Sequence, residues 1–123
     1  MSKTAYEDRV RKRMQIISEI QDDSFGPRPD PEIIQAVTAW LIHDAQEVLR
    51  RPYIYPTRDG GVSVEWDTSE GAIDLCMEPC GEGAPLIIGF GPRGDLSEGS
   101  TLEEALVWLR EQAQAAETQR SDP

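Results

Sequence analysis

The sequence contains few of the residues that form metal centres, disulfide frameworks or histidine-based catalytic sites. Among its 123 residues are two cysteines, Cys76 and Cys80, and one histidine, His43. Two cysteines cannot form a disulfide framework, and they lack the further ligands that a zinc site needs at suitable spacing. We therefore expect two free thiols, no cofactor and a reducing, cytoplasmic environment.

Long apolar segments are also missing. No apolar run approaches the roughly 20 residues that cross a lipid bilayer. Residues 1–13 alternate charged residues with single apolar ones, unlike the basic and then apolar pattern of a secretory leader. The sequence thus predicts neither membrane insertion nor secretion by a cleaved signal.

Positive charge is scarce after residue 51. Residues 52–123 contain 4 Lys or Arg and 14 Asp or Glu, a net charge of −10, whereas residues 1–51 contain 8 and 9, a net charge of −1. Such an acidic region repels nucleic acid and anionic lipid and attracts basic protein surfaces. The charge balance favours a basic protein partner over nucleic acid or membrane. The alternative is that the acidity serves only to keep the protein soluble.

The residues that are present predict one α+β domain over residues 1–123, frayed at about 1–3 and 117–123. Two N-terminal helices are expected over 4–21 and 31–51. Four strands are expected at 53–57, 62–67, 72–78 and 85–91, and a C-terminal helix follows Ser100. Short connections between the strands predict a four-stranded antiparallel meander with the helices on one face.

Helical periodicity is clear in the first segment. Its apolar residues recur every three or four positions: Tyr6, Val10, Met14 and Ile17. The basic residues between them are expected on the opposite, solvated side: Arg9, Arg11, Lys12 and Arg13. Alternatively, this basic side meets the acidic second half of the same chain, or that of a second copy in a homodimer.

Start and stop signals bound the other two helices. Asp30 is a good N-cap, Pro31 suits the first helical position, and Pro52 ends the second helix. A capping box that pairs Ser100 with Glu103 begins the third helix. The cap explains Ser100 better than a nucleophilic role does, because no base is indicated for it.

The strand register follows from the alternation of apolar residues. A turn at 68–71 sets Trp66 opposite Ile73, and it also sets Val64 opposite Leu75 and Val62 opposite Met77. The fourth strand is expected to extend the same apolar face. In this register Leu86 lies opposite Met77, Ile88 opposite Leu75 and Phe90 opposite Ile73. For the first strand, Gly60 and Gly61 allow two turns, so either Tyr53 and Tyr55 or Ile54 and Pro56 point inward.

The other face of the predicted sheet is acidic. Glu65 lies opposite Asp74, a like-charge pair that costs a few tenths to about 1 kcal/mol unless something compensates. The candidate partner-binding residues are Glu65, Asp67, Asp74, Glu78 and Glu82. Alternatives are a solvated surface, or a metal or catalytic site that uses Glu65 and Asp74 with Cys76.

One segment resembles a known group of proteins. Residues 52–79, PYIYPTRDGGVSVEWDTSEGAIDLCMEP, are similar to small, uncharacterised bacterial proteins that share a proline-bounded strand, the pattern P-T-x-x-G-G-V and a following E-W. The meander with its TLEEALVWL helix is also similar in outline to small acidic immunity proteins that block secreted toxins. The resemblance implies an inhibitor of antitoxin or immunity type and brings no catalytic residues.

Together these observations predict a non-enzymatic, acidic binding protein that inhibits a basic, nucleic-acid-handling partner, as an antitoxin, immunity protein or DNA mimic does. Two alternatives stay open. One is a small metal- or ligand-binding enzyme that uses the carboxylates, and the other is a structural homo-oligomer.

Overall fold

The computed structural model describes residues 3–19, 27–81 and 84–121, with side chains described between residues 4 and 114. The helices are α1 (Lys3–Ser18), α2 (Pro31–His43), the short 3-10 helix η1 (Ala45–Glu47) and α3 (Leu102–Ser121). The strands are β1 (Tyr53–Pro56), β2 (Val62–Thr68), β3 (Gly71–Glu78) and β4 (Leu86–Phe90).

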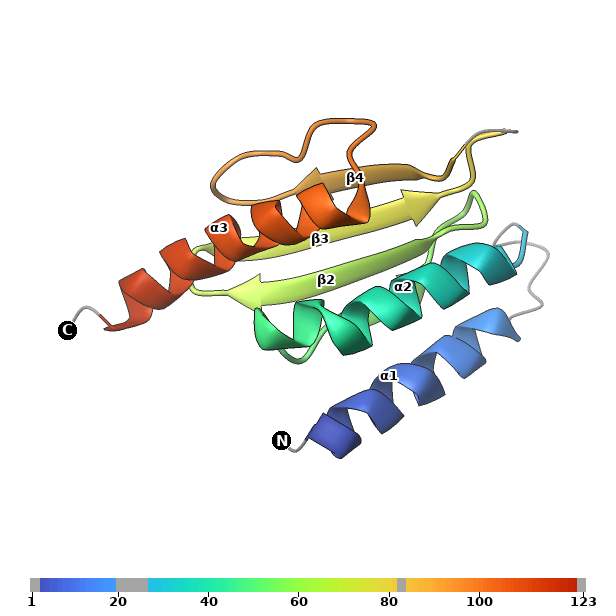
Figure 1. Cartoon of the computed structure of the whole chain (residues 1–123), viewed down its shortest axis with the longest axis horizontal. Coiled ribbons are helices and arrows are strands. Elements are labelled where there is room, and N and C mark those ends of the chain that lie inside the picture. Colours follow the sequence, from blue (N-terminus) through green and yellow to red (C-terminus); the bar gives the residue numbers. More distant parts are fainter. Residues whose placement is uncertain (1–2, 20–26, 82–83, 122–123) are drawn as a thin grey trace.

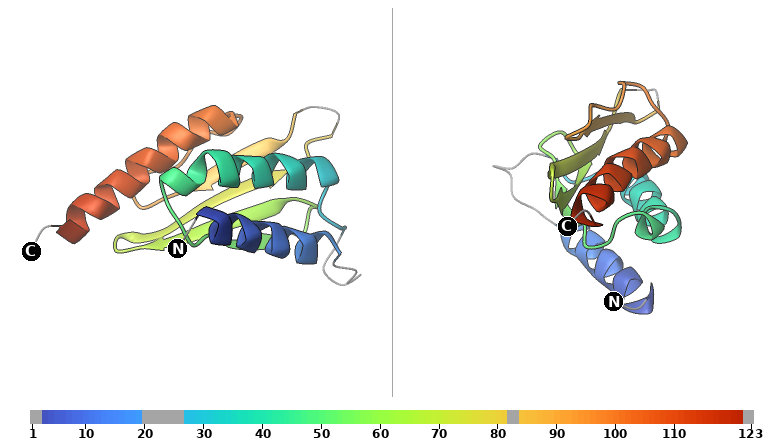
Figure 2. Two further views of the ribbon diagram at one scale, coloured as in Figure 1. Left: turned by 60° about the horizontal axis from the view of Figure 1, so that its bottom comes forward. Right: turned by 90° about the vertical axis from the view of Figure 1, so that its left-hand side faces the viewer.

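The four strands form one antiparallel sheet in the order β1-β2-β3-β4, so the predicted meander and α+β class are confirmed. Helices α2 and α3 lie over one face of this sheet (Figure 1). Helix α1 packs on α2 and on β1, beside the sheet (Figure 2).

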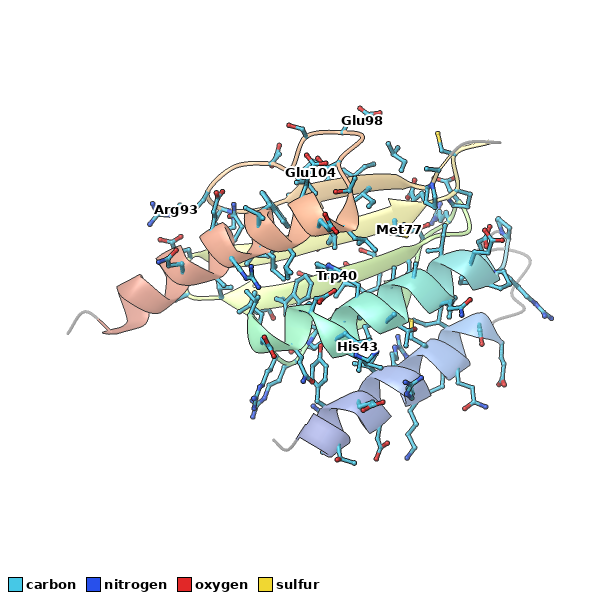
Figure 3. The ribbon with its side chains drawn as sticks, viewed as in Figure 1. Trp40, His43, Met77, Arg93, Glu98 and Glu104 are labelled. Carbon is cyan, nitrogen blue, oxygen red and sulfur yellow. The ribbon has the colours of Figure 1, made fainter. Side chains whose placement is uncertain are left out.

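The core lies between the helices and the covered face of the sheet. Trp66 on β2 is almost fully buried and meets Trp40 on α2 edge to face, with ring centroids 6.3 Å apart. Trp40 Nε1 donates to the carbonyl of Leu102, which ties α2 to the start of α3. Figure 3 shows Trp40 and Met77 on the side of the sheet that the helices cover. The predicted apolar seam of α1 is also buried: Tyr6, Val10, Met14 and Ile17.

Helix α2 begins as predicted but ends earlier. The Asp30 side chain accepts a hydrogen bond from Glu32 N–H, as expected for the N-cap. The predicted end near residue 51 is wrong, because the α-helix stops at His43. The buried Tyr6 hydroxyl donates to the carbonyl of Leu41, which would accept the Ala45 N–H if the helix continued. A tertiary contact with α1 thus competes with the next helical turn.

The capping box of α3 lies one residue later than predicted. Thr101 Oγ1 accepts from Glu104 N–H, and Glu104 Oε1 accepts from Thr101 N–H. Ser100 instead donates its hydroxyl to the Ser97 carbonyl. The sequence STLEE offers a Ser or Thr three residues before a Glu twice, so the pattern alone did not distinguish the two positions.

The predicted register of β2 and β3 is confirmed at every pair named above, including Glu65 opposite Asp74. On β1, Ile54 points inward and is buried, whereas Tyr53 is exposed. The β1–β2 connection is the longer of the two turns. Thr57 N–H donates to the Gly61 carbonyl, and Gly60 between them has a φ of 87°, which glycine tolerates best.

The predicted register of β4 is wrong by one residue. Ile87 pairs with Met77 and Gly89 with Leu75, so Ile87 and Gly89 face the helices. The reason lies in α3. A Cβ atom on Gly89 would lie 3.0 Å from Cη2 of Trp108, so this glycine leaves the space that the indole occupies. Leu86, Ile88 and Phe90 therefore lie on the other face.

No helix in the described ranges is long and apolar enough to cross a membrane.

Candidate functional site: the open face of the sheet

The face of the sheet opposite α2 and α3 is not covered by any described helix (Figure 2). We call it the open face. Strand alternation and register assign to it Tyr53 and Tyr55 from β1, Ser63, Glu65 and Asp67 from β2, Ala72, Asp74, Cys76 and Glu78 from β3, and Leu86, Ile88 and Phe90 from β4.

Carboxylates occupy the middle of the open face. Glu65 and Asp74 are direct cross-strand partners, and both side chains are half-buried. Asp67 is exposed and Glu78 is half-buried on the same two strands. Four of the five candidate residues thus share one face, whereas Glu82 lies outside the described residues.

The acidic centre affects the neighbouring tyrosine. Tyr55 donates its hydroxyl to Glu65 Oε2 at 3.3 Å. A hydrogen bond with Ser63 lowers the pKa of Tyr55, but burial and the carboxylates of Glu65 and Asp74 outweigh it, so the pKa is raised above 10.0. The negative charge of the carboxylates therefore extends to Tyr55 on the edge strand β1.

Cys76 stands among these carboxylates as a poor nucleophile. Its thiol donates to Ser63 Oγ at 3.2 Å. Burial raises the pKa of Cys76, the Ser63 hydrogen bond lowers it in part, and the charges of Glu78 and Asp74 raise it further. Reactive cysteines need the opposite environment, which stabilises a thiolate. Cys76 and Cys80 are both free thiols, as predicted.

Apolar side chains flank the acidic centre on both sides. Tyr53 is 59% exposed on β1, and Phe90 is 52% exposed on β4. Leu86 and Ile88 extend the apolar flank along β4 and are half-buried. Sequence reasoning missed the β4 flank. The signal that could have found it is the glycine pair at 89 and 91, because Trp108 and Gln112 of α3 fill the space that Cβ atoms there would need.

The edges of the sheet are protected. Arg13 Nε donates to the Ile54 carbonyl at 2.7 Å, so this carbonyl points outward from β1 and is occupied. Pro52 and Pro56 lie two residues before and two residues after Ile54, and neither has a backbone N–H group to donate. At β4, Leu96 N–H donates to the outward carbonyl of Gly89. These contacts and prolines hinder the addition of a further strand at the two edges.

One carboxylate next to the sheet is neutralised. Glu70, in the β2–β3 turn, accepts two hydrogen bonds from Arg93 at 2.9 and 2.8 Å. The hydrogen bond and charge of Arg93 lower the pKa of Glu70. This pair ties the turn to the β4–α3 loop, where Figure 3 labels Arg93 and Glu98. The carboxylates of the open face have no such basic partner among the described residues.

The arrangement gives little support to a metal centre. Among the described residues, no three His, Cys, Asp or Glu side chains are grouped so that they could hold a metal ion. His43 lies at the exposed end of α2, apart from the open face. The geometry instead provides a surface with negative charge at its centre and apolar side chains on both flanks.

Compared with protein-family models, curated proteins and solved structures, the chain shows no match. The resemblance to small bacterial proteins and to immunity proteins therefore stays a prediction.

Proposed function

We propose that this protein binds a basic protein partner through the open face and acts as a non-enzymatic inhibitor of antitoxin, immunity or DNA-mimic type. The observation that carries the proposal is the arrangement of Glu65, Asp67, Asp74 and Glu78 between two apolar flanks. Charge complementarity defines the occupant as a surface rich in Lys and Arg.

The carboxylate centre supports a cationic partner. Glu65 and Asp74 are held opposite each other, which costs the free protein a few tenths to about 1 kcal/mol. A Lys or Arg side chain placed between them relieves this repulsion and forms charge-assisted hydrogen bonds. A nucleic acid does the reverse, because its phosphates add negative charge.

The flanks support a protein rather than a small cation. Protein interfaces are enriched in exposed aromatic side chains, which bury large areas with little loss of side-chain entropy. Tyr53 and Phe90 supply such side chains on opposite sides of the carboxylates. The partner surface that fits has basic residues in its middle and apolar contacts around them.

A charge-matched pair of variants tests the proposal. The triple variant E65Q/D74N/E78Q removes three charges from the open face, and D95N/E98Q/E111Q removes three from exposed positions outside it. Immobilised wild type and both variants are exposed to lysate of the native host at low and high salt. The retained proteins are identified, and each is purified and its binding remeasured.

We expect a basic protein that wild type and D95N/E98Q/E111Q retain at low salt and that E65Q/D74N/E78Q loses. Direct binding of the purified partner must reproduce this order. Equal retention by the two variants contradicts docking on the open face. Light scattering of the free protein identifies the case in which the partner is a second copy.

A further inference from the structure

Three arginines surround a groove between α1 and β1. The groove has a volume of about 600 Å³ and is lined by Tyr6, Arg9, Val10, Arg13, Arg51, Pro52, Tyr53 and Ile54. Volumes of roughly 300–1,000 Å³ are typical of small-molecule sites. The lining contains no carboxylate, although the chain has a net charge of −11.

Helix α1 places two of the arginines. Arg9 and Arg13 are four residues apart and line the groove beside the buried residues Tyr6 and Val10. Both arginines are exposed, as predicted for the solvated side of α1, and they also line the groove. Arg13 Nε is fixed by its hydrogen bond to the Ile54 carbonyl, which leaves its terminal amino groups for a further acceptor.

The third arginine is held in an unusual backbone conformation. Arg51 has a φ of 65°, and no other non-glycine residue in the described ranges has a positive φ. This region favours glycine, because an L-residue with a side chain is strained there. Such strain is typical of residues whose position serves a site.

These guanidinium groups have no anionic partner in the described part of the chain. The ion pairs of Arg11 with Glu7 and of Arg93 with Glu70 involve none of these three arginines. Arg9, Arg13 and Arg51 thus converge on one groove without a carboxylate to neutralise them.

We propose that this groove binds a small organic anion. Its carboxylate or phosphate contacts the three guanidinium groups, which suit planar, bidentate recognition of such oxygens. Its apolar body lies against Val10, Pro52 and Ile54. The groove adjoins the open face at Tyr53 but is lined by different charged residues, and the proposal does not depend on the basic partner.

Two probes of equal shape test the charge requirement. 2-Naphthoate carries a carboxylate, and 2-naphthamide carries a neutral amide on the same ring system. Titration of the full chain, followed by amide NMR shifts, should show saturable binding of 2-naphthoate with the largest shifts in α1 and residues 51–54. We expect its affinity to exceed that of 2-naphthamide about tenfold or more, as one charge-assisted contact gives.

Variants then locate the site. R9Q and R51G should each weaken 2-naphthoate binding about tenfold. Glycine at position 51 keeps the backbone conformation, so the fold is retained, which the NMR spectrum itself verifies. The control R110Q removes an exposed arginine from α3 and should leave the affinity unchanged.

Three results overturn the proposal. They are equal affinities for the two probes, no saturable binding of 2-naphthoate, and an R110Q effect as large as that of R9Q. Concentration-dependent dimerisation that R9Q abolishes, without binding of 2-naphthoate, would assign the groove to a second copy.

Discussion

The two faces of the sheet share four strands and yet present different surfaces. On the covered face, side chains of α2 and α3 fill the space between helices and sheet, and even the two glycines near the end of β4 accommodate Trp108 and Gln112. On the open face, the same strands present carboxylates, tyrosines and aliphatic residues with no helix above them. We infer that the covered face determines stability and the open face determines binding.

The largest test of this contrast uses two adjacent isoleucines. Ile87 faces the core and is 5% exposed, whereas Ile88 lies on the open face. I87A should lower the free energy of unfolding by about 2–4 kcal/mol, and I88A by less than about 1 kcal/mol. Urea unfolding measures both. The opposite order would restore the register that the sequence alone predicted.

The dependence of protein stability on pH above 10 distinguishes a tyrosine in the core from one on the open face. Burial raises the pKa of Tyr6 from 10.0 to about 12, and the charge of Arg50 offsets part of this effect. Because the neutral phenol is favoured in the folded state, its stabilisation is complete below pH 10 and is lost as pH rises towards 12. The loss should be about 2–3 kcal/mol.

The matched controls for this prediction are Y6F and Y55F. Y6F removes the buried hydroxyl, so its unfolding free energy should fall less between pH 10 and 12 than that of wild type. Y55F, on the open face, should retain most of the wild-type fall. If the two variants behave alike, the structural difference between the two tyrosines is contradicted.

The packing of α3 on β4 gives a smaller effect. G89A places a methyl group 2.9 Å from Leu96 Cβ and 3.0 Å from Trp108 Cη2. We expect overpacking to lower the free energy of unfolding by about 1–3 kcal/mol. A W108A background removes the contact with the indole and leaves only the one with Leu96, so the same substitution should cost less there. An equal cost in both backgrounds would mean that Trp108 does not lie over Gly89.

The smallest predicted effect has the opposite sign. D74N removes the repulsion with Glu65 and should raise the free energy of unfolding by a few tenths to about 1 kcal/mol at low salt. High salt should reduce the gain, because it screens partly exposed charges. D95N on the β4–α3 loop serves as the control and should change stability less. A loss of stability in D74N would mean that the two carboxylates do not repel each other.

The sequence predicted β2 and β3 well because their apolar and polar residues alternate strictly and a short turn fixes the register. It failed at β4 because Leu86, Ile87 and Ile88 are all apolar, so periodicity could not assign a face. Only the contact of Trp108 with Gly89 decides it. The end of α2 likewise depends on a hydrogen bond from Tyr6, a residue 35 positions away from Leu41.

The candidate site was predictable in part for the same reason. Glu65, Asp67, Asp74 and Glu78 follow from the β2–β3 register, whereas the apolar flank depends on β4. The groove arginines were visible as a basic cluster on the first helix. Their convergence with Arg51 needs the approach of α1 to β1, which no local pattern encodes.

The most direct test of the central claim is the dissociation constant of the purified basic partner for wild type, E65Q/D74N/E78Q and D95N/E98Q/E111Q at one salt concentration. We predict that the open-face variant, still folded and at least as stable as wild type, binds at least about a hundredfold more weakly, since it loses several charge-assisted contacts. The loop and α3 variant should bind within a few-fold of wild type. Equal dissociation constants for the two triple variants would contradict the assignment of binding to the open face.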